Sequence, residues 1–166
     1  MAGFRIFAVA FVLAILTMTA AAQRIDSKRD LPADASKEVV EGWLADALRR
    51  YGKYEIPRRS ASLKNVKVAD CTVSYTLVSE TGDSSHATMG ATIRTGKTTR
   101  DVTVDLADVQ TAEIVEHIFP ELRSIVLQRE SRDLKAITAL ELAVQTEAAE
   151  KIAGGFNRAI GQCRSQ

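Results

Sequence analysis

The sequence predicts an α+β domain in which an antiparallel sheet of about four to six strands is flanked by an N-terminal and a C-terminal amphipathic helix. Helical stretches with a single apolar stripe lie near both ends of the chain. Between them, apolar and polar residues alternate, and glycine-containing turns interrupt the alternation. Each helical stripe needs an apolar surface to cover it, so we expect one domain over residues 34–166.

The first 22 residues have the features of a secretory signal peptide. Arg5 precedes an apolar run over residues 6–18, and small residues follow at 20–22. The run is about 13 residues long, short of the roughly 20 residues that span a bilayer. We therefore expect cleavage near Ala22-Gln23 and an exported protein, periplasmic or extracellular, rather than an uncleaved membrane anchor.

The chain that remains after cleavage is balanced in charge. It has 166 − 22 = 144 residues, and because Arg5 is the one charged residue removed, 21 basic residues face 21 acidic ones. Such a chain has no overall attraction to nucleic acid, and 5% aromatic residues do not suggest a platform that stacks bases or sugars. We expect no nucleic-acid partner and no cofactor. Residues 23–33 are polar and contain Pro32, which predicts a flexible leader.

The first helix is predicted after this leader, up to Gly52. Asp34 or Ser36 can cap its start, and Gly52 suits a left-handed C-terminal position. Arg49 and Arg50 in the last turn complement the helix dipole. Apolar residues recur every three or four positions and form one stripe: Val39, Val40, Trp43, Leu44, Ala47, Leu48 and Tyr51.

From Leu63 the period changes to two, which indicates strands. Val66 and Val68 share one face, and the phase then shifts at Ala69-Asp70, which predicts a bulge or a tight turn. The next alternating face consists of Cys71, Val73, Tyr75 and Leu77. Glycine-containing turns at 80–83 and 95–97 separate further strands at 85–94 and 98–106. This order predicts an antiparallel meander.

The last third of the chain leaves one alternative open. Residues 108–121 form a helical turn or a loop ended by Pro120, and residues 123–129 form a short strand. Residues 134–163 are either one long helix or a strand followed by a helix. We favour the second interpretation, because Thr146 followed by Glu147 is typical of a helix start. One face of the final helix carries Ala149, Ile152, Ala153, Phe156, Ile160 and Cys163.

The two cysteines, Cys71 and Cys163, favour a structural role. The sequence has two histidines and no Cys-x-x-Cys pattern, so it predicts no metal site. One pair of cysteines in an exported chain favours a disulfide, with two buried free thiols as the alternative. Cys71 belongs to the strand face of Val73, and Cys163 lies on the apolar stripe of the last helix. If that helix packs on that face, the two sulfur atoms meet in one layer.

The sequence contains three groups of residues that could be considered for catalysis, and none has the full pattern of a known catalytic site. Residues 83–86 (Asp-Ser-Ser-His) resemble a triad in composition, but neighbouring strand residues point to opposite faces. Glu113 and His117 would share one face of a helix, although Glu113 stands where a zinc helix needs histidine. Nothing marks the acidic clusters around Glu113 and Asp105 as buried acids with a raised pKa. We expect a non-enzymatic protein, with a hydrolase built on Glu113, Glu116 and His117 as the alternative.

One segment carries a strong charge imbalance. Between residues 49 and 67 only Glu55 opposes seven basic residues, a net charge of +7 − 1 = +6. The basic residues are Arg49, Arg50, Lys53, Arg58, Arg59, Lys64 and Lys67. They form either a patch for an anionic partner, such as lipid head groups, polysaccharide or an acidic protein, or a solvated segment after a helix. A membrane therefore enters only as a weak surface contact.

A loose motif also covers most of the chain beyond residue 34. Its first half, WLxxxL…YGxY, consists of Trp43, Leu44, Leu48, Tyr51, Gly52 and Tyr54. Its second half, NVxxxxCxVxY, consists of Asn65, Val66, Cys71, Val73 and Tyr75. This pattern resembles small secreted bacterial proteins of unknown function, and the order of elements is similar to pleckstrin-homology-like folds. Neither resemblance implies an activity for any residue. We expect a small exported domain of the bacterial envelope or extracellular space that binds an unknown protein or small ligand.

Overall fold

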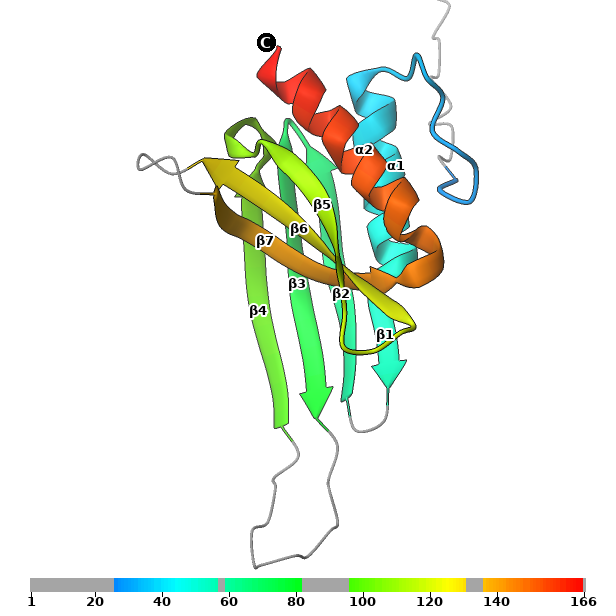
Figure 1. Ribbon diagram of the computed structural model, residues 1–166, viewed down its shortest axis with the longest axis vertical. Helices are drawn as coiled ribbons and strands as arrows, with labels where there is room; N and C mark the ends of the chain where they lie inside the picture. The colour runs from blue at the N-terminus through cyan, green and yellow to red at the C-terminus, as the bar shows by residue number, and fades with distance from the viewer. Residues whose placement is uncertain (1–25, 57–58, 82–95, 131–135, 166) are drawn as a thin grey trace, which may run out of the picture.

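A computed structural model describes residues 26–56, 59–81, 96–130 and 136–165 (Figure 1). The predicted α+β class, with one helix at each end, is confirmed. The elements in chain order are α1 (Lys37–Tyr51), β1 (Lys53–Ile56), β2 (Arg59–Ala69), β3 (Thr72–Thr81), β4 (Gly96–Asp105), the short 3₁₀ helix η1 (Leu106–Asp108), β5 (Thr111–Glu116), β6 (Leu122–Glu130), β7 (Ala136–Gln145) and α2 (Thr146–Arg164).

Within the described residues, the strands form two antiparallel sheets rather than one. The first has the order β1-β2-β3-β4 and the second the order β5-β6-β7. Figure 1 shows the second sheet crossing the first, with the two helices packed together beside them. The outer strands β1 and β7 are in contact, and Gln145 of β7 donates a hydrogen bond to the Lys53 carbonyl of β1. The two sheets therefore meet along one edge.

Both helices bury the predicted apolar stripe. Trp43 is 3% exposed, and Leu44, Leu48, Ile152 and Phe156 are fully buried. Helix α1 packs on β2 and α2, whereas α2 also packs on β5, β6, β7 and η1. One connected hydrophobic core therefore joins the two helices and both sheets. No helix of the described segments is long and apolar enough to cross a membrane.

Gly52 closes α1 in a different way from the prediction. Its φ is −82°, so it does not adopt the left-handed conformation. A side chain is excluded instead by close packing. A Cβ atom at Gly52 would lie 2.5 Å from the Leu48 carbonyl oxygen and 2.5 Å from Cδ1 of Leu63. Glycine thus allows the chain to turn from α1 directly into β1 against β2.

The phase shift at Ala69-Asp70 is a tight turn, one of the two forms predicted. Ala69 pairs with Thr72, so Asp70 and Cys71 are the two residues of the β2–β3 loop. Both have positive φ, 51° and 61°, as the two-residue hairpin loops that match strand twist require. Cys71 therefore lies in the turn and not in the strand. A separate register shift lies between Lys64 and Lys67, where Asn65 has a φ of 53°.

In the second half of the chain, the structure decides between the two interpretations of residues 134–163 and differs from the prediction for residues 108–121. The strand-then-helix interpretation is confirmed, since β7 ends at Gln145 and α2 begins at Thr146. Residues 111–116 form β5 and not a helical turn or a loop. Their apolar residues fall on both faces, so no two-residue period marked a strand, and pairing with β6 decides the structure. The strand predicted at 85–94 lies outside the described residues.

Part of the predicted leader lies against α1. Ser27 is 2% exposed, and both its backbone N–H and its hydroxyl donate to a carboxylate oxygen of Asp46, at 2.9 and 2.8 Å. Burial raises the pKa of Asp46, but the hydrogen bonds from Ser27 and Arg50 outweigh it and hold that pKa below its usual value. Trp43 Nε1 donates to the Arg29 carbonyl at 2.9 Å.

Candidate functional site

The predicted disulfide is present between Cys71 and Cys163, with 5.7 Å between their Cα atoms. The Glu41 carboxylate, 7% exposed, accepts a 2.9 Å hydrogen bond from the Cys71 backbone N–H. The sulfur atoms and a Glu41 oxygen lie within 4.8 Å of one another. Both sulfurs are consumed by the disulfide, so this buried group joins α1, the β2–β3 turn and α2 and is not a metal site while the bond is intact.

The basic residues between positions 49 and 67 do not all lie on one surface. Arg49 donates to the Val66 carbonyl at 2.8 Å, and Arg50 forms ion pairs with Asp26 and Asp46. The strand register places Lys53, Lys64 and Lys67 on one face of the first sheet and Arg59 on the other. Arg58 lies outside the described residues. The patch for an anionic partner remains a prediction.

The acidic residues and the histidine of the hydrolase alternative do not share one site. Glu113 and Glu116 are three residues apart on β5, so their side chains point to opposite faces of the strand. The Glu113 carboxylate accepts a 2.8 Å hydrogen bond from Gln128. His117 follows the strand, and its Nδ1 accepts from the Phe119 backbone N–H at 3.2 Å. Residues 83–86 lie outside the described part of the chain.

A cleft of about 230 Å³ opens between the two sheets. The end of α1 and the first sheet contribute Gly52, Tyr54, Ala61, Leu63, Tyr75 and Leu77. The second sheet and the loop after β5 contribute His117, Ser124, Glu141, Leu142 and Ala143. Residues between positions 52 and 143 thus converge here.

The floor of the cleft is apolar because of the pairing of β2 with β3. Leu63 and Leu77 are direct cross-strand partners and lie half-buried on the same face. Tyr75 lies two residues before Leu77 and therefore points to that face as well. The absent side chain of Gly52 leaves the space that Leu63 occupies. The floor can therefore hold an apolar group.

The opposite wall carries a hydrogen-bonded polar pair. Ser124 of β6 is 3% exposed, and its hydroxyl donates a 2.9 Å hydrogen bond to Oε1 of Glu141 on β7. The Glu141 side chain is otherwise exposed, and its register partner is Val126. A carboxylate accepts several hydrogen bonds, so Glu141 retains oxygen lone pairs for a donor that enters the cleft.

Tyr75 supplies a second polar group. The residue is 4% exposed, and burial raises the pKa of its phenol to about 12, although the nearby Arg100 acts in the opposite direction. Among the described residues, its hydroxyl has no hydrogen-bond partner. Nε2 of His117 likewise has none within the described segments. The cleft therefore combines an apolar floor with polar atoms that have no partner among the described residues, and this is the usual composition of a small-molecule site.

The sequence pointed to His117 for a different reason and did not indicate Tyr75, Ser124 or Glu141 as a site. One signal for Ser124 is its place directly before the apolar run 125–127 of β6. No matching family model, curated protein or solved structure was found for this chain. The resemblance to small secreted bacterial proteins therefore remains a prediction, and the cleft geometry is the basis for assigning a function.

Proposed function

We propose that this protein is a small exported binding domain, without enzymatic activity, whose inter-sheet cleft holds a small apolar molecule. The observation that carries the proposal is the cleft itself, with the paired Leu63 and Leu77 on one side and free polar atoms of Tyr75 and Glu141 around it. The signal-peptide features of residues 1–22 and the Cys71–Cys163 disulfide support export.

The volume of the cleft and the charge of Glu141 limit which apolar ligands it can hold. Its volume lies below the range of drug-sized sites, which favours a ligand the size of one or two fused rings. Among the described residues that line it, Glu141 is the one aspartate, glutamate, lysine or arginine. Glu141 attracts a hydrogen-bond donor or a cation and repels an anion. The ligand is thus apolar over most of its surface, with a hydroxyl or amino group at one end.

Three naphthalene probes of similar size test this assignment. The purified protein, labelled with ¹⁵N, is titrated with 2-naphthol, 2-naphthylmethylamine and 2-naphthoate, and amide shifts are followed by NMR. We expect the alcohol and the amine to shift amides of β2, β3, β6 and β7 around the cleft, and the carboxylate to bind about tenfold more weakly. Equal binding of all three probes, or shifts confined to other surfaces, would refute the proposal.

Glu141→Gln provides the matched variant. It retains an acceptor for the Ser124 hydroxyl but removes the charge. The discrimination against 2-naphthoate should then disappear while 2-naphthol still binds. If the variant discriminates as the unmodified protein does, Glu141 does not face the bound ligand.

A further inference from the structure

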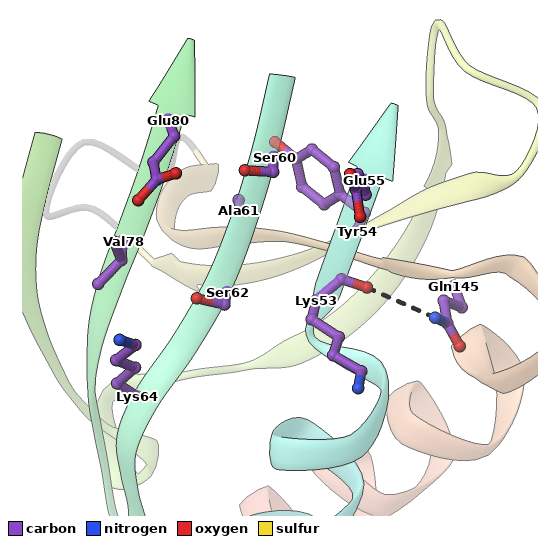
Figure 2. A pocket seen from close by; sticks show the side chains of 10 residues that line it. All are labelled: Lys53, Tyr54, Glu55, Ser60, Ala61, Ser62, Lys64, Val78, Glu80 and Gln145. Carbon is purple, nitrogen blue, oxygen red and sulfur yellow. Dashed lines mark hydrogen bonds between the residues drawn. The ribbon is translucent and has the colours of Figure 1, made fainter. Parts of the chain in front are cut away.

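A second and larger hollow, of about 430 Å³, lies over the opposite face of the first sheet (Figure 2). Ten residues line it: Lys53, Tyr54, Glu55, Ser60, Ala61, Ser62, Lys64, Val78, Glu80 and Gln145. Seven of them, at 53, 55, 60, 62, 64, 78 and 80, share the outer face by strand register. This outer hollow adjoins the cleft, with which it shares Tyr54 and Ala61, but its charged residues and serines lie on the other face of the sheet. A ligand bound there goes beyond the proposed function.

Opposite charges occupy opposite ends of the outer hollow. Ser60 pairs with both Glu55 and Glu80, so the two carboxylates flank one serine. Ser62 lies two residues after Ser60 on β2, and it pairs with Lys53 of β1. Lys64 lies two residues after Ser62 on β2. Figure 2 shows the two lysines at one end and the two glutamates at the other. The hollow is therefore an extended dipole that runs along β2.

The middle of the outer hollow is lined by one apolar side chain and two serine hydroxyls. Val78, 8% exposed, forms an apolar floor between the charged ends. The hydroxyls of Ser60 and Ser62 line the same stretch, and neither is hydrogen-bonded to another described residue. These hydroxyls can donate to and accept from peptide groups.

Most of the charges are available to a ligand. Within the described segments, Lys53, Lys64 and Glu55 have no ion-pair partner, whereas Glu80 forms a 2.7 Å ion pair with Lys97. Side chains of Glu80 and Lys97 remain 52% and 62% exposed, so that pair is open to solvent. A ligand with one charge at each end would pair with groups that have no ion-pair partner among the described residues.

We propose that the outer hollow binds a short peptide with free termini, its carboxylate at Lys53 and Lys64 and its ammonium group at Glu55 and Glu80. Ser60 and Lys64 are four residues apart, a separation of about 13 Å along a strand. An extended chain of about three or four residues spans that distance. A single amino acid spans much less than this backbone separation, and a peptide with a blocked terminus leaves one end unpaired.

The test uses tetraglycine, which has no side chains of its own. The ¹⁵N-labelled protein is titrated with tetraglycine, with its N-acetylated and C-amidated forms, and with glycine. We expect tetraglycine to shift amides of β1, β2 and β3 on the outer hollow, each single capping to weaken binding about two- to fivefold, and glycine to bind more weakly still. Triglycine and 8-aminooctanoate have the same number of chain atoms, but 8-aminooctanoate has no peptide groups. We expect triglycine to bind more tightly than 8-aminooctanoate. Equal binding of these two would overturn the assignment to a peptide.

Two neutral substitutions complete the test. Lys64→Gln and Glu55→Gln should each weaken tetraglycine binding about two- to fivefold. Lys67→Gln lies on the same strand face beyond the register shift, and Glu116→Gln lies on β5, so both should leave the affinity unchanged. Equal binding of capped and free peptides, or equal effects of all four substitutions, would overturn the proposal. Absence of amide shifts at millimolar tetraglycine would overturn it as well.

Discussion

Gly155 of α2 lies directly against the indole ring of Trp43 in α1. A Cβ atom at Gly155 would be 2.9 Å from Cζ3 of Trp43 and 3.0 Å from Cδ2 of Leu44. The neighbouring Gly154 is exposed, and a Cβ atom there would meet no other atom within 4 Å. The two adjacent glycines therefore differ in role, because one sets the distance between the helices and the other faces solvent.

Alanine at these two positions should change stability in opposite directions. Gly155→Ala forces the Trp43 ring or the helices to shift, and we expect the free energy of unfolding to fall by about 1–3 kcal/mol. Gly154→Ala gains helix propensity without a clash and should raise it by about 0.5–1 kcal/mol. Urea denaturation measures both. A Gly155→Ala variant as stable as the unmodified protein would contradict the packing of α2 on Trp43.

Reduction of the Cys71–Cys163 disulfide should destabilise the protein strongly. The bond closes a loop across a separation of 92 residues, for which the chain-entropy model gives up to about 4–5 kcal/mol. We expect the double variant Cys71→Ala/Cys163→Ala to unfold at lower urea concentration than the oxidised protein. The reductant should lower the midpoint of the unmodified protein and leave that of the double variant unchanged. A midpoint unaffected by reductant in both proteins would be inconsistent with the disulfide.

Glu41 should contribute through the backbone N–H of Cys71. Glu41→Leu leaves that buried donor without an acceptor, which should cost about 1–3 kcal/mol of unfolding free energy. Glu41→Gln keeps an acceptor oxygen of the same reach and should cost clearly less. Thermal or urea unfolding of the oxidised proteins compares them. Equal losses for the two variants would show that the carboxylate charge, and not the hydrogen bond, matters.

The buried phenol of Tyr75 should make stability depend on pH at the alkaline end. Its folded pKa of about 12 exceeds the unfolded value of about 10. Below about pH 10 the stabilisation of the neutral phenol is present in full. As the pH rises toward 12, the unfolded chain loses a proton that the folded chain keeps, so the free energy of unfolding falls by on the order of 2–3 kcal/mol.

The comparison with Tyr75→Phe isolates this effect. The unfolding free energy of the unmodified protein minus that of Tyr75→Phe should fall by on the order of 2–3 kcal/mol between about pH 10 and pH 12. Phenolate absorbance should show a late titration step near pH 12 that is absent from the variant. A difference that stays constant over this range would indicate that Tyr75 is not desolvated.

The helices and most strands follow from local pattern, because each stripe or alternation records which side faces the core. Trp43, Leu44 and Phe156 mark their helix faces clearly, and Thr146 marks the start of α2. The alternation in 111–116 is weak, with Ile114 and Val115 both exposed on adjacent positions, so β5 is defined only by its partner β6. Division into two sheets is likewise a tertiary property.

The cleft could not be assembled from sequence for the same reason. Tyr75, Ser124 and Glu141 are far apart along the chain and meet only because β1 and β7 bring the two sheets together. Periodicity placed Tyr75 on an apolar face but gave no sign that its hydroxyl borders a cleft. The Cys71–Cys163 pairing is confirmed, although Cys71 lies in the β2–β3 turn and not on the strand face from which the pairing is predicted.

The most direct test of ligand binding in the cleft is to fill it. Ala143 lines the cleft and is half-buried, so Ala143→Leu places a larger side chain in the space for a ligand. Ala107→Leu makes the same exchange at an exposed position in η1. The quantity to measure is the affinity for 2-naphthol by NMR titration of both folded variants. We expect Ala143→Leu to weaken binding about tenfold or more and Ala107→Leu to leave it unchanged; unchanged affinity in Ala143→Leu would contradict a ligand site between the sheets.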